Sequence, residues 1–151
     1  MTVIAWDGKT LASDSLVCLG NAVYSSQKIF SNDEYLVGIS GEAAVGLELV
    51  EWIFEKGMNK ADFPSKQKEE MLCNVLLIKK DRSTYFIENS HVPYPIFSKH
   101  IALGAGADMA LGVMHSGKNA IDAVEIAVKL NAHCAGEAKS IDFDEWVKNA
   151  R

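Results

Sequence analysis

The first thirteen residues constrain the fold most, because they predict a β-hairpin that begins at the second residue of the chain. Thr2–Trp6 is short, apolar and partly β-branched, which is typical of a strand. Asp7-Gly8 follows and indicates a two-residue hairpin turn, and Lys9–Ser13 is expected to form the returning strand. A hairpin here would hold a terminus that otherwise frays, and would place Thr2 at a defined point of a sheet.

The rest of the chain predicts further strands and helices in alternating runs. Apolar, β-branched stretches predict strands at Ser15–Leu19, Ala22–Phe30, Tyr35–Ile39, Met71–Lys79, Ser83–Ile87, Ile101–Leu103 and Ala138–Phe143. Helical spacing of apolar residues predicts helices at Ala43–Phe54, Ala107–His115 and Lys118–Asn131, with a helical tail at Asp144–Arg151. Asn59–Lys68 is expected to be a loop or a short helix, and His91–Phe97, with its two prolines, a loop or an edge strand. This order favours an α+β domain over residues 1–151 rather than βαβ repeats.

Composition narrows the function classes. A chain of 151 residues with 48% hydrophobic residues can bury a core without a metal or disulfide staple. Its net charge of −5 argues against a nucleic-acid partner. Three cysteines, Cys18, Cys73 and Cys134, match no zinc motif and favour free thiols in a reducing compartment.

The sequence predicts a cytoplasmic protein without a membrane partner. No signal peptide begins the chain, and no segment approaches the ~20 apolar residues that span a bilayer. Four scattered histidines have no metal-ligand spacing, so neither a metal nor a cofactor is expected.

Three residues of the first thirty could form a hydrolytic site. Removal of Met1 would give Thr2 a free α-amine, which is basic enough near neutral pH to activate the neighbouring hydroxyl. An ammonium from Lys28 would favour ionisation of that hydroxyl, and a carboxylate from Asp14 would orient the lysine. Taken singly, each of these residues is more typical of a strand or of the protein surface. The evidence for a hydrolytic site is therefore the order in which the three occur together.

That order resembles proteasome β subunits and HslV, including their shorter bacterial and phage relatives. The matching elements are Met-Thr-x-Ile-Ala, the Asp-Gly turn, Ala-x-Asp-Ser, Lys-Ile and Val-Gly-Ile-Ser-Gly, and Ile101–Gly106 and Lys118–Asn131 extend the resemblance over most of the chain. The resemblance implies an N-terminal-nucleophile hydrolase with a four-layer α/β/β/α sandwich. It also implies that Thr2, Asp14 and Lys28 are catalytic and that the backbone N–H of Gly41 binds the oxyanion.

Three supporting positions depart from the family pattern. Ala105 stands where active members carry a serine that positions the terminal amine and a water. Asn131 replaces an aspartate, and Cys134 replaces another serine. An asparagine still forms hydrogen bonds but supplies no negative charge. These replacements put the rate of catalysis in question and leave the three primary residues in place.

The resemblance implies a threonine-type peptidase subunit within a homo-oligomeric ring, either single or stacked. Its substrate would be a peptide or an unfolded protein, delivered by an ATP-dependent unfoldase, and its pocket would lie near Phe30 and Ala43–Leu47. Two alternatives stay open: a catalytically inactive, ring-forming homologue, and a small-molecule amidase on the same fold.

Overall fold

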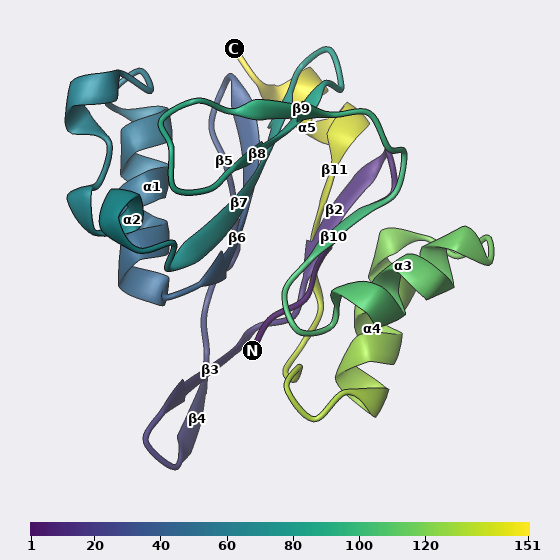
Figure 1. Ribbon diagram of the computed structural model, residues 1–151. Coiled ribbons are helices and arrows are strands. Elements are labelled where there is room, and N and C mark those ends of the chain that lie inside the picture. Colours follow the sequence, from purple (N-terminus) through teal and green to yellow (C-terminus); the bar gives the residue numbers. More distant parts are fainter.

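The computed structural model describes residues 1–151 and arranges them in four layers, with two sheets between two layers of helices (Figure 1). One sheet has the strand order β10-β1-β2-β11 and the other β5-β6-β7-β8-β9, with every neighbouring pair antiparallel. The strands of the first sheet are β1 (Ile4–Trp6), β2 (Thr10–Ser13), β10 (Ile101–Leu103) and β11 (Lys139–Asp142). Those of the second are β5 (Ile29–Ser31), β6 (Tyr35–Gly41), β7 (Cys73–Lys79), β8 (Thr84–Ile87) and β9 (Tyr94–Ile96).

Helices cover the outer face of each sheet. Helix α1 (Ala43–Phe54) packs on the five-stranded sheet, and α3 (Ala107–His115) and α4 (Ala120–Leu130) pack on the four-stranded sheet. The predicted four-layer α/β/β/α sandwich is therefore confirmed. The segment 59–68 contains two short helices, η1 (Lys60–Asp62) and α2 (Ser65–Glu69), and α5 (Phe143–Asn149) ends the chain. None of the helices is both long enough and apolar enough to cross a membrane.

Three apolar clusters join the layers, and the period-two alternation of the strands distributes residues between them. Along β6, Val37 and Ile39 face α1, whereas Leu36 faces the other sheet. The cluster beneath α3 and α4 is rich in alanine, which brings the helices close to β1 and β2. Gly38 allows the two sheets to approach closely, because a Cβ there would lie 2.7 Å from Cγ2 of Ile4.

The turn of the first hairpin lies one residue later than predicted. Trp6 pairs with Leu11 and Asp7 N donates to Thr10 O at 3.4 Å, so Gly8 and Lys9, rather than Asp7 and Gly8, lie inside the turn. The Asp7 side chain holds this turn, because its Oδ1 accepts hydrogen bonds from Lys9 N at 2.8 Å and Thr10 N at 2.7 Å. Such a side-chain turn is a usual role for aspartate.

The predicted strand Ala22–Phe30 is two strands separated by a break, so that prediction was wrong in its extent. Strand β4 (Ala22–Ser25) pairs only with β3 (Leu16–Leu19), and the two form a ribbon that projects from the sandwich (Figure 1). At the base of the ribbon, Ser26 N donates to Ser15 O at 2.8 Å. The chain then enters the five-stranded sheet at Ile29, which leaves Lys28 at the junction.

Candidate active site

Thr2, Asp14 and Lys28 lie in contact at the start of β1. The Nζ of Lys28 donates to Oγ1 of Thr2 at 3.2 Å and to Oδ1 of Asp14 at 2.9 Å. All three residues are buried, with relative exposures of 5% for Thr2, 0% for Asp14 and 8% for Lys28. The structure therefore brings together the three residues that the sequence predicted as catalytic.

Backbone donors complete the surroundings of Asp14. Its Oδ1 also accepts from Val3 N at 3.0 Å, and its Oδ2 accepts from Ala135 N at 3.3 Å. A buried ion pair is tolerated when its remaining polar atoms are satisfied, and loss of one partner leaves a costly isolated charge. The two backbone bonds hold the carboxylate in place, so that it in turn holds Lys28.

Elements from both sheets position the cluster. Asp14 directly follows β2, and its N–H donates to Val3 O at 3.2 Å, which continues the first hairpin. Lys28 O accepts from Ile39 N at 2.9 Å and so joins the break before β5 to β6. Thr2 O accepts from Gly106 N at 3.1 Å. Gly104, with φ of +91°, is required beside it, because a Cβ there would collide with Thr2 O.

Met1 occupies the entrance to the Thr2 hydroxyl. Its carbonyl oxygen accepts from Oγ1 of Thr2 at 2.7 Å and from Nζ of Lys28 at 3.1 Å. While this peptide bond is intact, the nitrogen of Thr2 is an amide and is not a base. Removal of Met1 would free both the amine and one donor position of Lys28.

Gly41 lies at the end of β6, where its N–H is directed to the Thr2 side of the strand. Amides along a strand alternate in direction, and Ile39 N points to Lys28 O, so Gly41 N, two residues later, points to the same edge. Gly41 has φ of +133°, and a Cβ there would collide with Leu72 O. Only glycine fits this conformation without strain.

The three positions that depart from the family pattern lie in the loops beside Thr2. Ala105 is exposed between β10 and α3, and its carbonyl accepts from Nδ2 of Asn131 at 3.1 Å. Oδ1 of Asn131 accepts from His133 N at 2.8 Å, so both ends of that side chain are used within the loops. Cys134 is buried at 2% exposure. Burial, followed by the negative charge of Asp14, raises the pKa of its thiol, which leaves a neutral group beside the site.

A pocket of about 440 Å³ opens beside Thr2. Its wall comes from β3, from the two residues before Lys28, from the end of β6 and from the start of α1: Leu16, Val17, Cys18, Leu19, Ser26, Gln27, Ile39, Gly41, Glu42, Ala43 and Ala44 join Met1, Thr2 and Lys28. Phe30 and Leu47, which the sequence analysis placed near the pocket, do not line it. Phe30 lies on β5 and instead packs against the cluster beneath α1.

Two contributions to the site were missed by the sequence analysis. The first is the ribbon strand β3, whose half-buried Cys18 lines the pocket. The second is the backbone N–H of Ala135, which binds Asp14 from a loop 121 positions away. Only the apolar run of β3 was visible in the sequence, and a backbone donor in a loop has no sequence signal.

Comparison with known proteins identifies the fold. No protein-family model matches the sequence, and no curated protein matches it by sequence. Solved structures do match in three dimensions. Thiobacillus denitrificans BPH in complex with epoxomicin superposes with a TM-score of 0.70 at 21% identity, covering 93% of this chain and 97% of that chain.

Two further structures agree. Thiobacillus denitrificans BPH gives a TM-score of 0.69 at 19% identity, covering 93% of this chain and 96% of the other. Eukaryotic HslV from Trypanosoma brucei gives a TM-score of 0.65 at 16% identity, covering 93% and 98%. The chain therefore has the fold of the HslV and proteasome-type N-terminal-nucleophile hydrolases.

Proposed function

We propose that this chain is a threonine-type peptidase subunit in which Thr2, exposed by removal of Met1, is the nucleophile. The observation that carries the proposal is the hydrogen bond from Nζ of Lys28 to Oγ1 of Thr2, within a buried ion pair to Asp14 and beside an open pocket. A buried ion pair that points at a hydroxyl, rather than closing on itself, is typical of an activated nucleophile.

The chemistry begins with removal of Met1, for which the small Thr2 side chain makes the chain a suitable substrate of methionine aminopeptidase. Oγ1 of Thr2 then attacks the scissile carbonyl carbon, and the Thr2 amine accepts the hydroxyl proton through a water. The ammonium of Lys28 stabilises the alkoxide as it forms, and Asp14 keeps the lysine oriented. The N–H of Gly41 donates to the developing oxyanion.

Collapse of the tetrahedral intermediate breaks the C–N bond, and the departing amine takes the proton held by the Thr2 amine. The acyl group remains on Oγ1 as an ester. A water then attacks that ester, gives one proton to the amine, and releases the carboxylic acid with the Thr2 hydroxyl restored. Because one amine first accepts and then donates the proton, its position decides the rate.

The proposal includes the assembly and the setting of the subunit. We expect one domain over residues 1–151, which forms a homo-oligomeric ring, single or stacked, in the cytoplasm. The similarity to an HslV structure supports a ring, and through it an ATP-dependent unfoldase that supplies unfolded chains. The apolar wall formed by Leu16, Val17 and Ile39 favours peptides with an apolar side chain before the scissile bond.

A catalytically inactive, ring-forming homologue is the second candidate function. It is favoured by the neutral groups at Ala105, Asn131 and Cys134, since the loop that would hold the amine and its water offers no charge and no side-chain hydroxyl at these three positions. A small-molecule amidase would share the nucleophile and differ in its assembly, because it needs no enclosed chamber.

The test measures hydrolysis of a fluorogenic peptide with an apolar residue at the cleaved bond, alongside a small aliphatic amide. The parent chain and Thr2→Ala are compared, and sedimentation velocity gives the assembly state of both. Peptide cleavage that Thr2→Ala abolishes, in a ring, supports the peptidase. An intact ring without turnover on either substrate supports the inactive homologue, and cleavage of the small amide alone by a monomer or dimer supports the amidase.

A further inference from the structure

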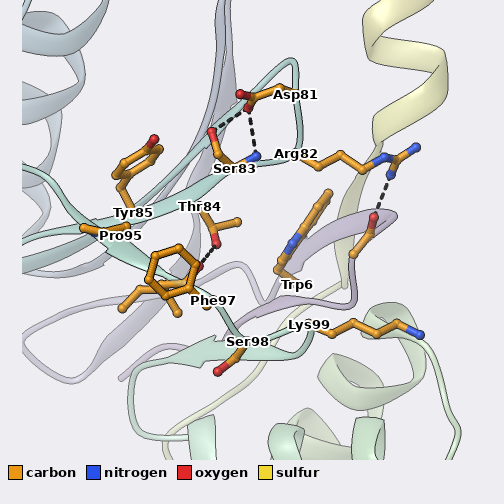
Figure 2. Close-up of a pocket in the computed structure, with 12 residues that line it drawn as sticks. Trp6, Asp81, Arg82, Ser83, Thr84, Tyr85, Pro95, Phe97, Ser98 and Lys99 are labelled. Atoms are coloured by element: carbon orange, nitrogen blue, oxygen red, sulfur yellow. Dashed lines mark hydrogen bonds between the residues drawn. The ribbon is translucent and has the colours of Figure 1, made fainter.

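A second concave surface lies at the opposite end of β1 from Thr2. It consists of two adjoining hollows of about 400 and 430 Å³ that share Gly8 and Lys99. Figure 2 shows the first hollow, with Trp6, Tyr85, Phe97 and Lys99 around it. We call the two hollows together the Lys99 groove. It shares no residue with the pocket beside Thr2.

One half of the Lys99 groove has an apolar wall beside a polar wall that includes Asp81 and Arg82. The apolar wall consists of Trp6, Tyr85, Pro95, Ile96 and Phe97, of which Phe97 is 94% exposed. An aromatic ring that stands almost wholly in water loses the stabilisation that burial would give it, of about 2 kcal/mol. Such a ring at the rim of a concave surface is typical of a contact site for another molecule.

The other half of the groove is basic. Lys9 comes from the first hairpin, Lys99 from the segment before β10, and Lys118 from the turn before α4. None of the three has a carboxylate within ion-pair distance, although the chain carries 20 acidic residues. His100 and His115 line the same hollow, edge to face, with ring centroids 4.8 Å apart.

The one acidic residue in this half, Asp7, forms no ion pair with the lysines, and its single negative charge leaves their sum positive. Oδ1 of Asp7 accepts from Lys9 N and Thr10 N, and Oδ2 accepts from Ala120 N at 2.8 Å in the first turn of α4. Its carboxylate is thus used to hold the turn and the helix end. Burial and the nearby positive groups, His115 and Lys99, lower the pKa of His100, with Asp7 acting in the opposite direction.

We propose that the Lys99 groove binds an acidic peptide segment that carries an aromatic or large apolar side chain and belongs to a partner protein. The charge complementarity is local, because three unpaired lysines gather on one surface of a chain whose net charge is −5. Carboxylates of the segment would lie between Lys9, Lys99 and Lys118, and its apolar side chain would cover Phe97. The two adjoining hollows, of about 400 and 430 Å³, suit a peptide better than a single small anion.

The experiment uses the full chain and a fluorescein-labelled peptide of alternating Glu-Glu-Phe triplets, measured by fluorescence polarisation. Two control peptides replace every glutamate by glutamine or every phenylalanine by serine. Lys99→Glu reverses the charge shared by both hollows, and we expect it to weaken peptide binding about tenfold. Lys68→Glu makes the same charge change on the exposed face of α2 and is expected to leave the Kd unchanged. Phe97→Ser is expected to weaken binding only of peptides that contain phenylalanine.

Three results would overturn the proposal. The first is an equal loss of affinity in Lys99→Glu and Lys68→Glu, which would indicate only long-range charge. The second is equal binding of the serine control peptide together with full displacement by inorganic phosphate, which would indicate a simple anion site. The third is a lower sedimentation coefficient of unliganded Phe97→Ser, which would show that a second copy of this chain covers the groove. None of these readouts depends on Thr2, so the proposed peptidase activity and this binding site stand or fall separately.

Discussion

The two sides of the Thr2 site differ in how they are built. On one side, Lys28 and Asp14 form a buried ion pair whose polar atoms are bound by backbone donors and by the Thr2 hydroxyl. On the other side, the loops that contain Ala105 and Asn131 are more exposed and bind each other only through neutral groups. The first side would activate the hydroxyl, and the second would hold the amine and its water.

An active member of the fold is expected to need both an activated hydroxyl and a positioned amine with its water, and here the two requirements fall on different sides of the site. The ion-pair side is costly to disturb, because removal of one buried charge strands the other. The loop side is cheaper to change at Ala105 and Asn131, because the first is exposed, the second is half-buried, and both are neutral. Mutations on the ion-pair side should therefore affect stability and reactivity together, whereas mutations on the loop side should affect reactivity alone.

The largest effect is expected from Lys28→Met, which keeps the length of the side chain and removes its charge. Asp14 would then be a buried carboxylate without its counter-ion, and the free energy of unfolding should fall by about 3–5 kcal/mol. Urea denaturation measures the loss. The double variant Asp14→Asn, Lys28→Met should recover most of the stability but react with no nucleophile-directed probe. A Lys28→Met protein as stable as its parent would show that the ion pair contributes nothing to the free energy of unfolding.

The second prediction compares three thiols around the site. Burial raises the pKa of Cys73 from 9.0 to about 11, which lowers its thiolate fraction at neutral pH about a hundredfold. Burial also raises the pKa of Cys134. Cys18, half-buried on the pocket wall, should therefore be alkylated first by iodoacetamide, as measured by mass spectrometry of peptides over time. Faster alkylation of Cys134 would mean that the loop side opens more readily than the pocket.

The third prediction concerns the strained end of β6. Gly41→Ala places a methyl group against Leu72 O at a φ of +133°, and should cost about 1–3 kcal/mol of stability and move the oxyanion donor. Gly112→Ala is the matched control, because nothing lies within 4 Å of a Cβ there. That control should be neutral or stabilising by up to about 1 kcal/mol. Equal thermal melting of the two variants would contradict the assignment of strain to Gly41.

The smallest effect is expected from Ala105→Ser, which adds a hydroxyl to the loop side. If that side limits the reaction, the rate of modification of Thr2 should rise about tenfold without a change in thermal stability. Ala132→Ser, in the exposed loop after Asn131, is the control and should leave the rate unchanged. A similar rate in both variants would indicate that the loop side does not limit the chemistry.

Much of this molecule could be predicted from the sequence, for physical reasons that differ by region. The layers follow from strand and helix periodicity, which is a local property of the chain. The positions of Thr2 and Asp14 follow from the first hairpin, because antiparallel pairing brings the start of one strand beside the end of the other. The contact with Lys28 followed only from the resemblance to HslV, since that residue comes from the other sheet.

What could not be predicted depends on tertiary contacts. The run Ala22–Phe30 has the residue types of one strand, yet its first part pairs with β3 up to the Ser26–Ser15 bond, and from Lys28 onward the chain pairs with β6. As a result, residues of β3 line the pocket, whereas the sequence analysis expected Phe30 there. The shifted first turn is held by the Asp7 carboxylate, which also binds the distant Ala120 N. Each of these depends on a hydrogen bond whose partner lies elsewhere in the sequence.

The most direct test of the central claim is intact-mass spectrometry of the purified protein before and after incubation with epoxomicin, the compound bound in the similar BPH structure. The account predicts a mass that lacks Met1, a single adduct equal to one inhibitor, and no adduct in Thr2→Ala. Retention of Met1, or a processed chain that takes up no inhibitor, would contradict it and would favour a subunit whose assembly, rather than its chemistry, is the function.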